Sequence, residues 1–324
     1  MKHLVRAWVV SILVTSLTAL MSAPVVAKQD DTAQILLNIQ DAARNLDYEG
    51  VFTYYFNDQM HSYRIAHRLD GDSERERLEA LDNFVREFIR HDNVVTCVLP
   101  DRKVVLTEAR KRARFPALLM SMPSDFSKFY ELVRKPAPGR VAGRDCVELE
   151  LVPKDAYRSG VRICADQETG LLLKAQVLDE QGLVAQQVVF TQVVINEDVS
   201  DAALESNWVT HDWKKITQER TPVDLERLGW TYDAPPGFHV SQQTRRLFQD
   251  GREVDQLLLT DGLASISVFI EPYQGDLSQH QITGLRQGRS GYLYGKRLED
   301  FWVMVVGDVP EKSLLWVADS IRRK

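Results

Sequence analysis

The chain has 324 residues, with 40 Lys and Arg against 46 Asp and Glu, so its formal net charge at pH 7 is −6. Hydrophobic residues make up 44% of the sequence, which is typical of a globular protein with a packed core and excludes a disordered or repetitive chain. The excess of acidic charge argues against nonspecific binding to nucleic acid, because such binding needs a basic face.

The first 27 residues have the pattern of a secretory signal peptide. Lys2 and Arg6 give a basic start, an apolar stretch runs from Ala7 to Leu20, and Val25-Val26-Ala27 ends it as a cleavage site. The apolar stretch is shorter than the roughly 20 residues of a membrane-spanning helix. The residue directly after the cleavage site is Lys28 and not a cysteine, so a lipid anchor is not expected. We therefore predict a mature protein that begins near residue 28 and occupies an oxidising space outside the cytoplasm.

Residues 28–206 predict an N-terminal domain rich in β-structure. Apolar residues recur at helical spacing from Asp31 to Leu46 and indicate an amphipathic helix. The spacing then changes to two, which is typical of strands with one buried face. The predicted strands are Gly50–Phe56, Tyr63–Leu69, Glu74–Leu81, Val85–His91, Val94–Leu99, Lys103–Glu108, Val141–Val152, Arg158–Asp166, Leu171–Leu178 and Leu183–Ile195. Together they favour one large, strongly curved antiparallel sheet with helices on its concave side.

Residues 207–224 are polar and aperiodic, and we interpret them as a linker between two domains. Residues 225–324 predict a smaller α+β domain. Its predicted strands are Phe238–Phe248, Val254–Thr260, Ala264–Ile270, Ser290–Lys296 and Phe301–Gly307. Pro310 then opens a closing helix whose apolar face consists of Leu314, Val317, Ala318 and Ile321.

Three cysteines, Cys97, Cys146 and Cys164, suggest one disulfide and one buried thiol in an exported protein. Cys146 and Cys164 lie on successive predicted strands. If they face each other, Glu148 lies opposite Arg162, and opposite charges across a ladder are mildly favourable. We therefore predict a Cys146–Cys164 disulfide on the polar face of the sheet and a buried Cys97. The buried face of the same two strands would consist of Val147, Leu149, Val161 and Ile163.

The segment from Arg114 to Tyr130 interrupts the strand pattern with prolines, methionines and aromatic residues. One interpretation is a helical plug that covers an open face of the sheet. The other is the adaptable wall of an apolar pocket for an acyl-chain ligand, since Met and Phe fit varied shapes. In the second case the pocket is lined by Phe52, Tyr54, Phe56, Phe115, Leu118, Leu119, Met122, Phe126 and Phe129.

The sequence nominates no catalytic or metal-binding residues. It lacks the G-x-S-x-G elbow of hydrolases and the H-E-x-x-H motif of zinc peptidases. His61 and His67 fall on one strand face but about 20 Å apart, at ~3.3 Å per residue, which is too far to share a metal ion. We therefore predict a binding protein without a cofactor rather than an enzyme.

Several segments, in their order and spacing, resemble the MucB/RseB family across the mature chain. They are Tyr48-Glu49-Gly50-Val51-Phe52, Ala66-His67-Arg68-Leu69-Asp70-Gly71, Glu74-Arg75-Glu76-Arg77-Leu78, Arg114-Phe115-Pro116, Val141-Ala142-Gly143-Arg144 to Cys146, Asp166-Gln167-Glu168-Thr169-Gly170-Leu171, Gly229-Trp230, Pro236-Gly237-Phe238 and Ser265-Ile266-Ser267-Val268. The resemblance implies a periplasmic negative regulator of the extracytoplasmic-stress sigma factor. It also implies an N-terminal domain like the carriers LolA and LolB, which is an unclosed β-barrel around helices, and a smaller C-terminal domain.

The resemblance further implies that the protein binds the periplasmic region of a membrane anti-sigma factor, shields it from proteolysis, and is released by lipopolysaccharide or a related lipid. A lipid or lipoprotein carrier of LolA type is the alternative, although a carrier has no evident use for the C-terminal domain. The sequence leaves a homodimer open. Residue types that dominate interface hot spots nominate partner contacts in the C-terminal domain; these are Arg245, Arg246, Tyr292, Tyr294 and Trp302. Phe301 and Trp302 point to opposite strand faces, so at most one of them is expected to be exposed.

Overall fold

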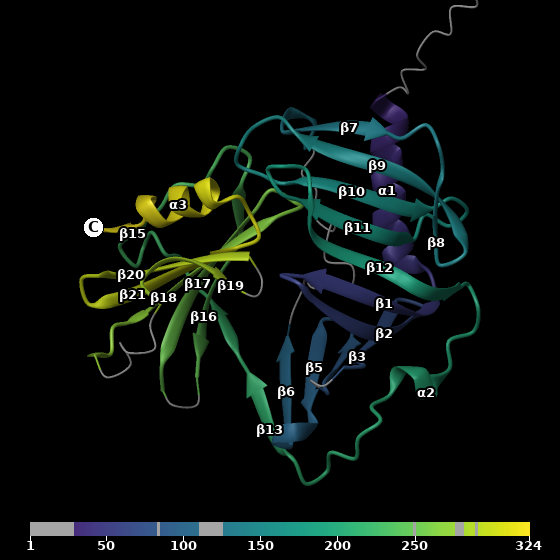
Figure 1. The fold of residues 1–324 in the computed structure, drawn as a ribbon. Helices are drawn as coiled ribbons and strands as arrows, with labels where there is room; N and C mark the ends of the chain where they lie inside the picture. The colour runs from purple at the N-terminus through teal and green to yellow at the C-terminus, as the bar shows by residue number, and fades with distance from the viewer. Residues whose placement is uncertain (1–28, 83–84, 110–125, 249–250, 276–281, 289–290) are drawn as a thin grey trace, which may run out of the picture.

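The computed structural model describes residues 29–82, 85–109, 126–248, 251–275, 282–288 and 291–324. Within these ranges the chain forms two domains, each built on its own β-sheet, that lie side by side (Figure 1). The fold is rich in strands and poor in helices, as the sequence predicted. None of the described helices is long and apolar enough to cross a membrane.

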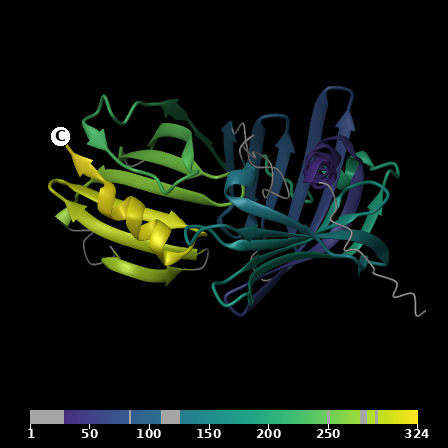
Figure 2. The same cartoon turned by 90° about the horizontal axis from the view of Figure 1, so that it is seen from above.

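The N-terminal domain is a curved sheet wrapped around helix α1 (Gln29–Asn45), which lies inside the curve (Figure 2). Its strands are β1 (Tyr48–Phe56), β2 (Gln59–Asp70), β3 (Ser73–Ala80), β4 (Glu87–His91), β5 (Val94–Leu99), β6 (Val104–Ala109), β7 (Tyr130–Arg134), β8 (Gly139–Val141), β9 (Arg144–Pro153), β10 (Gly160–Asp166), β11 (Leu172–Leu178), β12 (Val184–Ile195) and β13 (Lys214–Gln218). They follow the order β13-β6-β5-β4-β3-β2-β1-β12-β11-β10-β9-β7, with β8 paired to β9. Among the described strands β13 and β7 do not pair, so the predicted unclosed barrel is confirmed.

One face of β9 and β10 forms the core beneath α1. Period-two alternation places every second residue of these strands on that face. Its apolar residues pack against Leu36 and Ile39 of α1; they are Leu149, Leu151, Val161 and Ile163, each no more than 3% exposed. The amphipathic helix and the buried strand face thus form a single hydrophobic core, because each covers the apolar side of the other.

The C-terminal domain has a sheet in the order β14-β16-β17-β18-β21-β20-β19, with helix α3 (Glu311–Ser320) packed on one face. These strands are β14 (Arg220–Pro222), β16 (His239–Leu247), β17 (Glu253–Thr260), β18 (Ser265–Pro272), β19 (Gly284–Gly288), β20 (Gly291–Leu298) and β21 (Phe301–Gly307), and β15 (Trp230–Thr231) pairs separately with β22 (Arg322–Arg323). The predicted apolar face of the closing helix is confirmed, since Leu314, Val317, Ala318 and Ile321 are all buried.

The segment 207–224 differs from the aperiodic linker that the sequence predicted, because two short strands lie within it. After helix α2 (Asp201–Leu204), β13 adds to the edge of the first sheet in parallel with β6, and β14 then pairs with β16 of the second sheet. A parallel edge strand needs no alternating pattern, since only its backbone is engaged. The connection between the domains is therefore fixed to both sheets.

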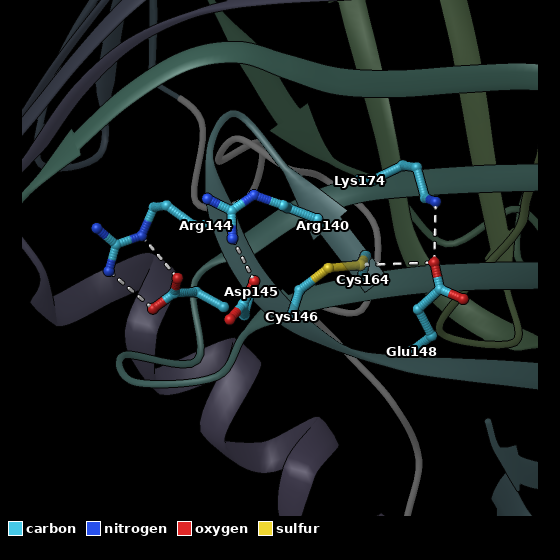
Figure 3. The surroundings of a disulfide bond; sticks show 8 residues. Arg140, Arg144, Asp145, Cys146, Glu148, Cys164 and Lys174 are labelled. Carbon is cyan, nitrogen blue, oxygen red and sulfur yellow. Dashed lines mark hydrogen bonds and ion pairs between the residues drawn. A yellow bond between two sulfur atoms is a disulfide. The ribbon is translucent and has the colours of Figure 1, made fainter. Parts of the chain in front are cut away.

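The predicted disulfide between Cys146 and Cys164 is confirmed (Figure 3). The predicted strand register, however, is wrong by two residues. Cys164 lies opposite Glu148, and Arg162 lies opposite Glu150, whose Oε2 accepts a hydrogen bond from the Arg162 Nε at 3.2 Å. The cysteines bridge diagonally with their Cα atoms 5.4 Å apart, inside the usual range. A shift of two keeps every side chain on its face, which is why the predicted faces hold although the pairs do not.

Both half-cystines are completely buried, although they share their sheet face with Glu148 and Arg162 as predicted. The short strand β8 folds over the disulfide. A Cβ added at Gly139 would lie 2.9 Å from the Cys164 Sγ, so only glycine allows this close approach. Cys97, in contrast, is half-buried rather than buried, because its neighbour Val98 faces the core from the opposite side of β5.

We expect loss of the disulfide to lower the free energy of unfolding by about 3 kcal/mol, since it closes a loop with a sequence separation of 18. Chemical denaturation of Cys146→Ser with Cys164→Ser would measure this, with Cys97→Ser as the control that should change little. Equal midpoints for the double variant and the wild type would contradict the assignment, as would mass mapping that joins Cys97 to either partner.

Candidate binding interface between the domains

Arg158 lies at the centre of the contact between the two domains. Its side chain is completely buried, and its Nη1 donates to Oδ2 of Asp261 at 3.2 Å. Nη2 donates to the carbonyl oxygen of Pro236, and Nε donates to Asp155 in its own loop at 3.0 Å. Since Asp261 and Pro236 belong to the C-terminal domain, one arginine from the loop between β9 and β10 ties the two sheets together.

Aromatic rings enclose this guanidinium group. Its central carbon lies 4.5 Å from the ring centre of Phe129 and 5.5 Å from those of Tyr130 and Phe238, which is cation–π geometry. The Tyr130 hydroxyl donates to Oδ2 of Asp261 at 2.9 Å. Burial, together with the charge of Asp261, raises the pKa of Tyr130, so its hydroxyl remains a donor. The site is buried, and both domains contribute to it.

Contacts on either side of Arg158 require a close approach of the C-terminal domain. Gly237 has a φ of +82°, and a Cβ there would lie 2.7 Å from the ring of Phe129, so glycine is needed on both counts. At the start of α3, the Ser313 hydroxyl donates to the carbonyl of Tyr157 at 2.5 Å. The ring of Trp316 meets Tyr157 edge-on, with ring centres 5.2 Å apart.

A second ionic contact joins the domains at β6. Glu108, which is 5% exposed, accepts hydrogen bonds from Arg220 of β14 and from Nη2 of Arg246 of β16, the latter at 3.2 Å. Arg220 also donates to Gln256 at 3.1 Å. Glu108 is buried between cations, so this contact depends on both domains being in place.

The face of the C-terminal sheet opposite α3 is also apolar but only partly covered. On the α3 side the alternating residues are at most 3% exposed; they are Leu257, Leu259, Ile266, Val268, Ile270, Val303 and Val305. On the other side five apolar side chains stay half-buried, which we name the second-face patch: Leu258, Phe269, Leu293, Met304 and Val306. Gln256 lies on the same face and contacts Arg220, so the patch is turned toward the N-terminal domain.

Tyr54 of β1 marks the other end of this boundary. Its hydroxyl donates to Oε1 of Gln186 at 3.1 Å, and Gln186 also hydrogen-bonds Asp308, which follows β21. Burial raises the pKa of Tyr54 to about 12, and the charge of Asp308 adds to the effect. Burial also raises the pKa of Asp308, against the opposing hydrogen bond from Gln186.

The structure distributes the predicted pocket residues over separate places. Phe52 is 3% exposed in the core, while Tyr54 and Phe56 are half-buried and stack 6.4 Å apart toward the end of β1. Phe126 belongs to a different buried cluster, beneath α1, and Phe129 lies on Arg158. In the sheet order, four strands separate β1 from β7. The remaining predicted lining residues fall outside the described ranges; they are Phe115, Leu118, Leu119 and Met122.

The predicted partner-contact residues are also reassigned in part. Trp302 is 6% exposed, on the same sheet face as Met304, whereas Tyr292 and Tyr294 pack on the α3 side against the core. Arg245 and Arg246 are not edge arginines facing solvent, because β14 pairs alongside β16.

Both arginines are engaged within the chain. Arg245 forms two hydrogen bonds to Asp255, at 2.6 and 2.9 Å, and an ion pair with Glu253 at 3.0 Å. Arg246 holds Glu108 between the domains.

A separate group of buried ionisable side chains lies inside the N-terminal sheet. His67 is fully buried, with Nδ1 2.8 Å from the carbonyl of Leu46 and Nε2 3.5 Å from Oε1 of Glu74. Its ring stacks on Tyr48 with centres 5.0 Å apart. Burial alone would lower the pKa of His67, but the contacts with Glu74, Glu76 and the carbonyl of Leu46 together outweigh it and raise the pKa.

Ser73, His91 and Asp92 meet at the surface but do not form a catalytic triad. The Ser73 hydroxyl lies 3.1 Å from Nε2 of His91 and 3.2 Å from Oδ1 of Asp92. A triad needs the carboxylate on the other ring nitrogen, whereas the nearest contact of Asp92 is to Nε2, at 4.0 Å. Across the described residues no group of three His, Cys, Asp or Glu side chains could hold a metal ion.

Removing Arg158 should separate or loosen the domains, because Asp261 would be left buried without its cation. We expect Arg158→Met to lower the free energy of unfolding by about 3–5 kcal/mol in chemical denaturation. The double variant Arg158→Met with Asp261→Leu should lose less stability, because it leaves no buried carboxylate without a cation. Arg227→Met is the matched control, since that side chain is 87% exposed. An unchanged midpoint for Arg158→Met would contradict the buried pairing.

The pH dependence of stability follows from His67. Its folded-state pKa is raised, so protonation favours the fold, and this contribution is complete below about pH 6.5 and lost as pH rises through the folded value. Denaturation midpoints between about pH 6 and 8 should fall with pH in the wild type and less in His67→Gln. The control is His211→Gln, at a side chain 82% exposed. The other groups that face the His67 ring are Tyr48 and Glu76, and Glu76 is paired with Arg90 at 3.8 Å. If stability falls with pH equally steeply in His67→Gln and in the wild type, this account is contradicted.

Comparison with known families and proteins shows an end-to-end match. The family model for the MucB/RseB N-terminal domain matches residues 31–208, and that for the MucB/RseB C-terminal domain matches residues 224–322. The sigma factor AlgU regulatory protein MucB of Pseudomonas aeruginosa is 32% identical over 319 residues, covering 94% of this chain and 95% of that protein. The sigma-E factor regulatory protein RseB of Haemophilus influenzae is 27% identical over 258 residues, covering 79% of this chain and 80% of that protein.

Solved structures agree in fold over almost the same length. The crystal structure of MucB in complex with MucA(peri) has a TM-score of 0.68 at 28% identity, covering 91% of this chain and 99% of that chain. The crystal structure of MucB has a TM-score of 0.65, also at 28% identity, covering 92% of this chain and 99% of that chain. With both domain models matched in order over nearly the whole chain, this protein belongs to the MucB/RseB family of sigma factor regulatory proteins, which is not an enzyme family.

Proposed function

We propose that this protein is a periplasmic regulator that binds the periplasmic region of a membrane anti-sigma factor. The observation that supports this most strongly is the match to the MucB chain of a complex with MucA(peri), which extends over 99% of that chain. Both domains are therefore present in a form similar to a protein that has been solved with such a partner.

We propose that the partner segment docks mainly on the C-terminal domain, along the second-face patch, with the N-terminal domain assisting across the boundary. Half-buried apolar side chains are suited to this role, because covering them removes apolar surface from water at little cost in polar pairing. Tyr54 and Phe56 lie on the N-terminal side of the same boundary. Of the residues predicted from sequence, Arg245, Tyr292 and Tyr294 lie on the α3 side of the sheet, so they are not part of the proposed docking surface.

Two consequences belong to this proposal. A flexible segment held between two domains cannot enter a protease, so binding would shield the anti-sigma factor from proteolysis. A lipopolysaccharide-type acyl chain that binds the same apolar surfaces would compete with the segment and release it, since each ligand must weaken the other. A LolA-type lipid or lipoprotein carrier is the second candidate. This function would not explain why Arg158 and Glu108 hold the C-terminal domain against the N-terminal domain.

Calorimetric titration of the full mature chain with the purified anti-sigma periplasmic region tests the proposal. We expect Phe269→Ser with Met304→Ser to weaken binding at least tenfold, the loss typical of a hot-spot truncation. The matched control is Leu247→Ser, an apolar residue 60% exposed on the α3-facing side of the same domain. Circular dichroism would confirm that each variant is folded.

The outcomes separate the function from the site. No binding by the wild type would refute the proposed function. Wild-type affinity in the double variant would refute the patch as the docking site but leave the function standing.

A further inference from the structure

The loop between α2 and β13 gathers apolar and basic side chains at one corner of the N-terminal domain, the lower end in Figure 1. Trp208 is 40% exposed and Val209 is 76% exposed. The rings of Trp208 and Trp213 lie 6.1 Å apart, so the apolar groups form one tip. Lys214 and Lys215, both exposed, follow directly at the start of β13. Exposed apolar clusters with a polar rim mark interaction sites.

Parallel pairing of β13 with β6 brings a second basic pair to the same corner. The backbone N–H of Lys214 donates to the carbonyl of Lys103 at 3.0 Å, next to Arg102. Parallel strands that start together place their preceding turns side by side. Two exposed carboxylates, Asp101 and Asp212, share the corner, so its net charge is positive. The cationic side chains are Arg102, Lys103, Lys214 and Lys215, all exposed.

The base of the loop is anchored on a buried carboxylate. The Ser206 hydroxyl donates to Oε2 of Glu87 at 2.5 Å, and the backbone N–H of Asn207 donates to Oε1 at 3.3 Å. Glu87 is itself held by Nη2 of Arg77 at 2.6 Å. The tip beyond these contacts is presented in a fixed place, which reduces the entropy lost on docking.

We propose that this corner docks on the surface of an anionic phospholipid bilayer. Tryptophan prefers the headgroup level of a membrane, and lysine near an anionic surface is attracted to it. Lysine is depleted at protein–protein interfaces, so the three lysines among the four cations around the tip favour a lipid surface over a protein partner. The chain as a whole carries −6, so repulsion elsewhere would orient this corner toward the membrane.

Co-sedimentation of the full mature chain with vesicles tests this proposal. We expect binding to vesicles of phosphatidylglycerol with phosphatidylethanolamine, weak binding to phosphatidylcholine alone, and a loss of binding as salt is raised. Lys214→Gln with Lys215→Gln should weaken binding to the anionic vesicles roughly 25-fold, at about fivefold per lysine.

Trp208→Ser with Val209→Ser should weaken binding at every salt concentration, because it removes the apolar contact. Leu183→Ser, at a hairpin residue 66% exposed on the same domain, is the control expected to bind as the wild type does.

Failure of the wild type to bind anionic vesicles at low salt would overturn the proposal. So would wild-type binding by both corner variants, or equal, salt-independent binding to the two kinds of vesicle, which would indicate acyl-chain uptake elsewhere. The inference does not depend on the proposed partner, since neither corner variant touches the second-face patch.

Discussion

The structure depends on one buried cation shared between two domains. Arg158 cannot remain buried unless Asp261 and the carbonyl of Pro236 reach it from the second domain, because an unpaired buried charge is strongly unfavourable. The surrounding rings of Phe129, Tyr130 and Phe238 enclose the guanidinium, with Phe238 contributed by the second domain. Two sheets that could each fold around their own core are thereby held in a defined relative orientation.

That orientation determines what the second-face patch can do. α3 covers the core residues on one side of the C-terminal sheet, and the other side would be an ordinary exposed apolar surface if the domain stood alone. Docked through Arg158 and Glu108, the patch instead faces the N-terminal sheet, where a bound segment would meet both domains. Any ligand that separates the domains would remove part of this surface, which is a simple physical route from a signal to the release of a partner.

Much of the fold follows from periodicity in the sequence, and the failures have identifiable causes. Alternating residues were sufficient to predict β9 to β12 and the faces of Leu149 and Ile163, and the cysteines were sufficient to predict their disulfide. The register was wrong by two because an even shift leaves every face unchanged, so the hydrophobic pattern cannot distinguish the two alignments. β13 and β14 were missed because they are short edge strands held by backbone pairing.

The interface was less predictable than the fold. Arg158 and Glu108 look like ordinary surface charges in the sequence, which does not show that their partners Asp261, Arg220 and Arg246 come from the other domain. The second-face patch was missed because Leu258, Phe269 and Met304 alternate with core residues. Each strand is therefore apolar at successive positions, which is the pattern of a strand buried on both faces. Trp302 was assigned to a partner surface on residue type alone, and residue type does not report burial.

The central claim is that the docked arrangement of the two domains is the form that binds the partner. The most direct measurement is the affinity of Arg158→Met for the anti-sigma periplasmic region, with small-angle X-ray scattering of the same sample to report domain separation. The account predicts a larger radius of gyration together with at least tenfold weaker binding. Wild-type affinity in a variant whose domains have separated would contradict it.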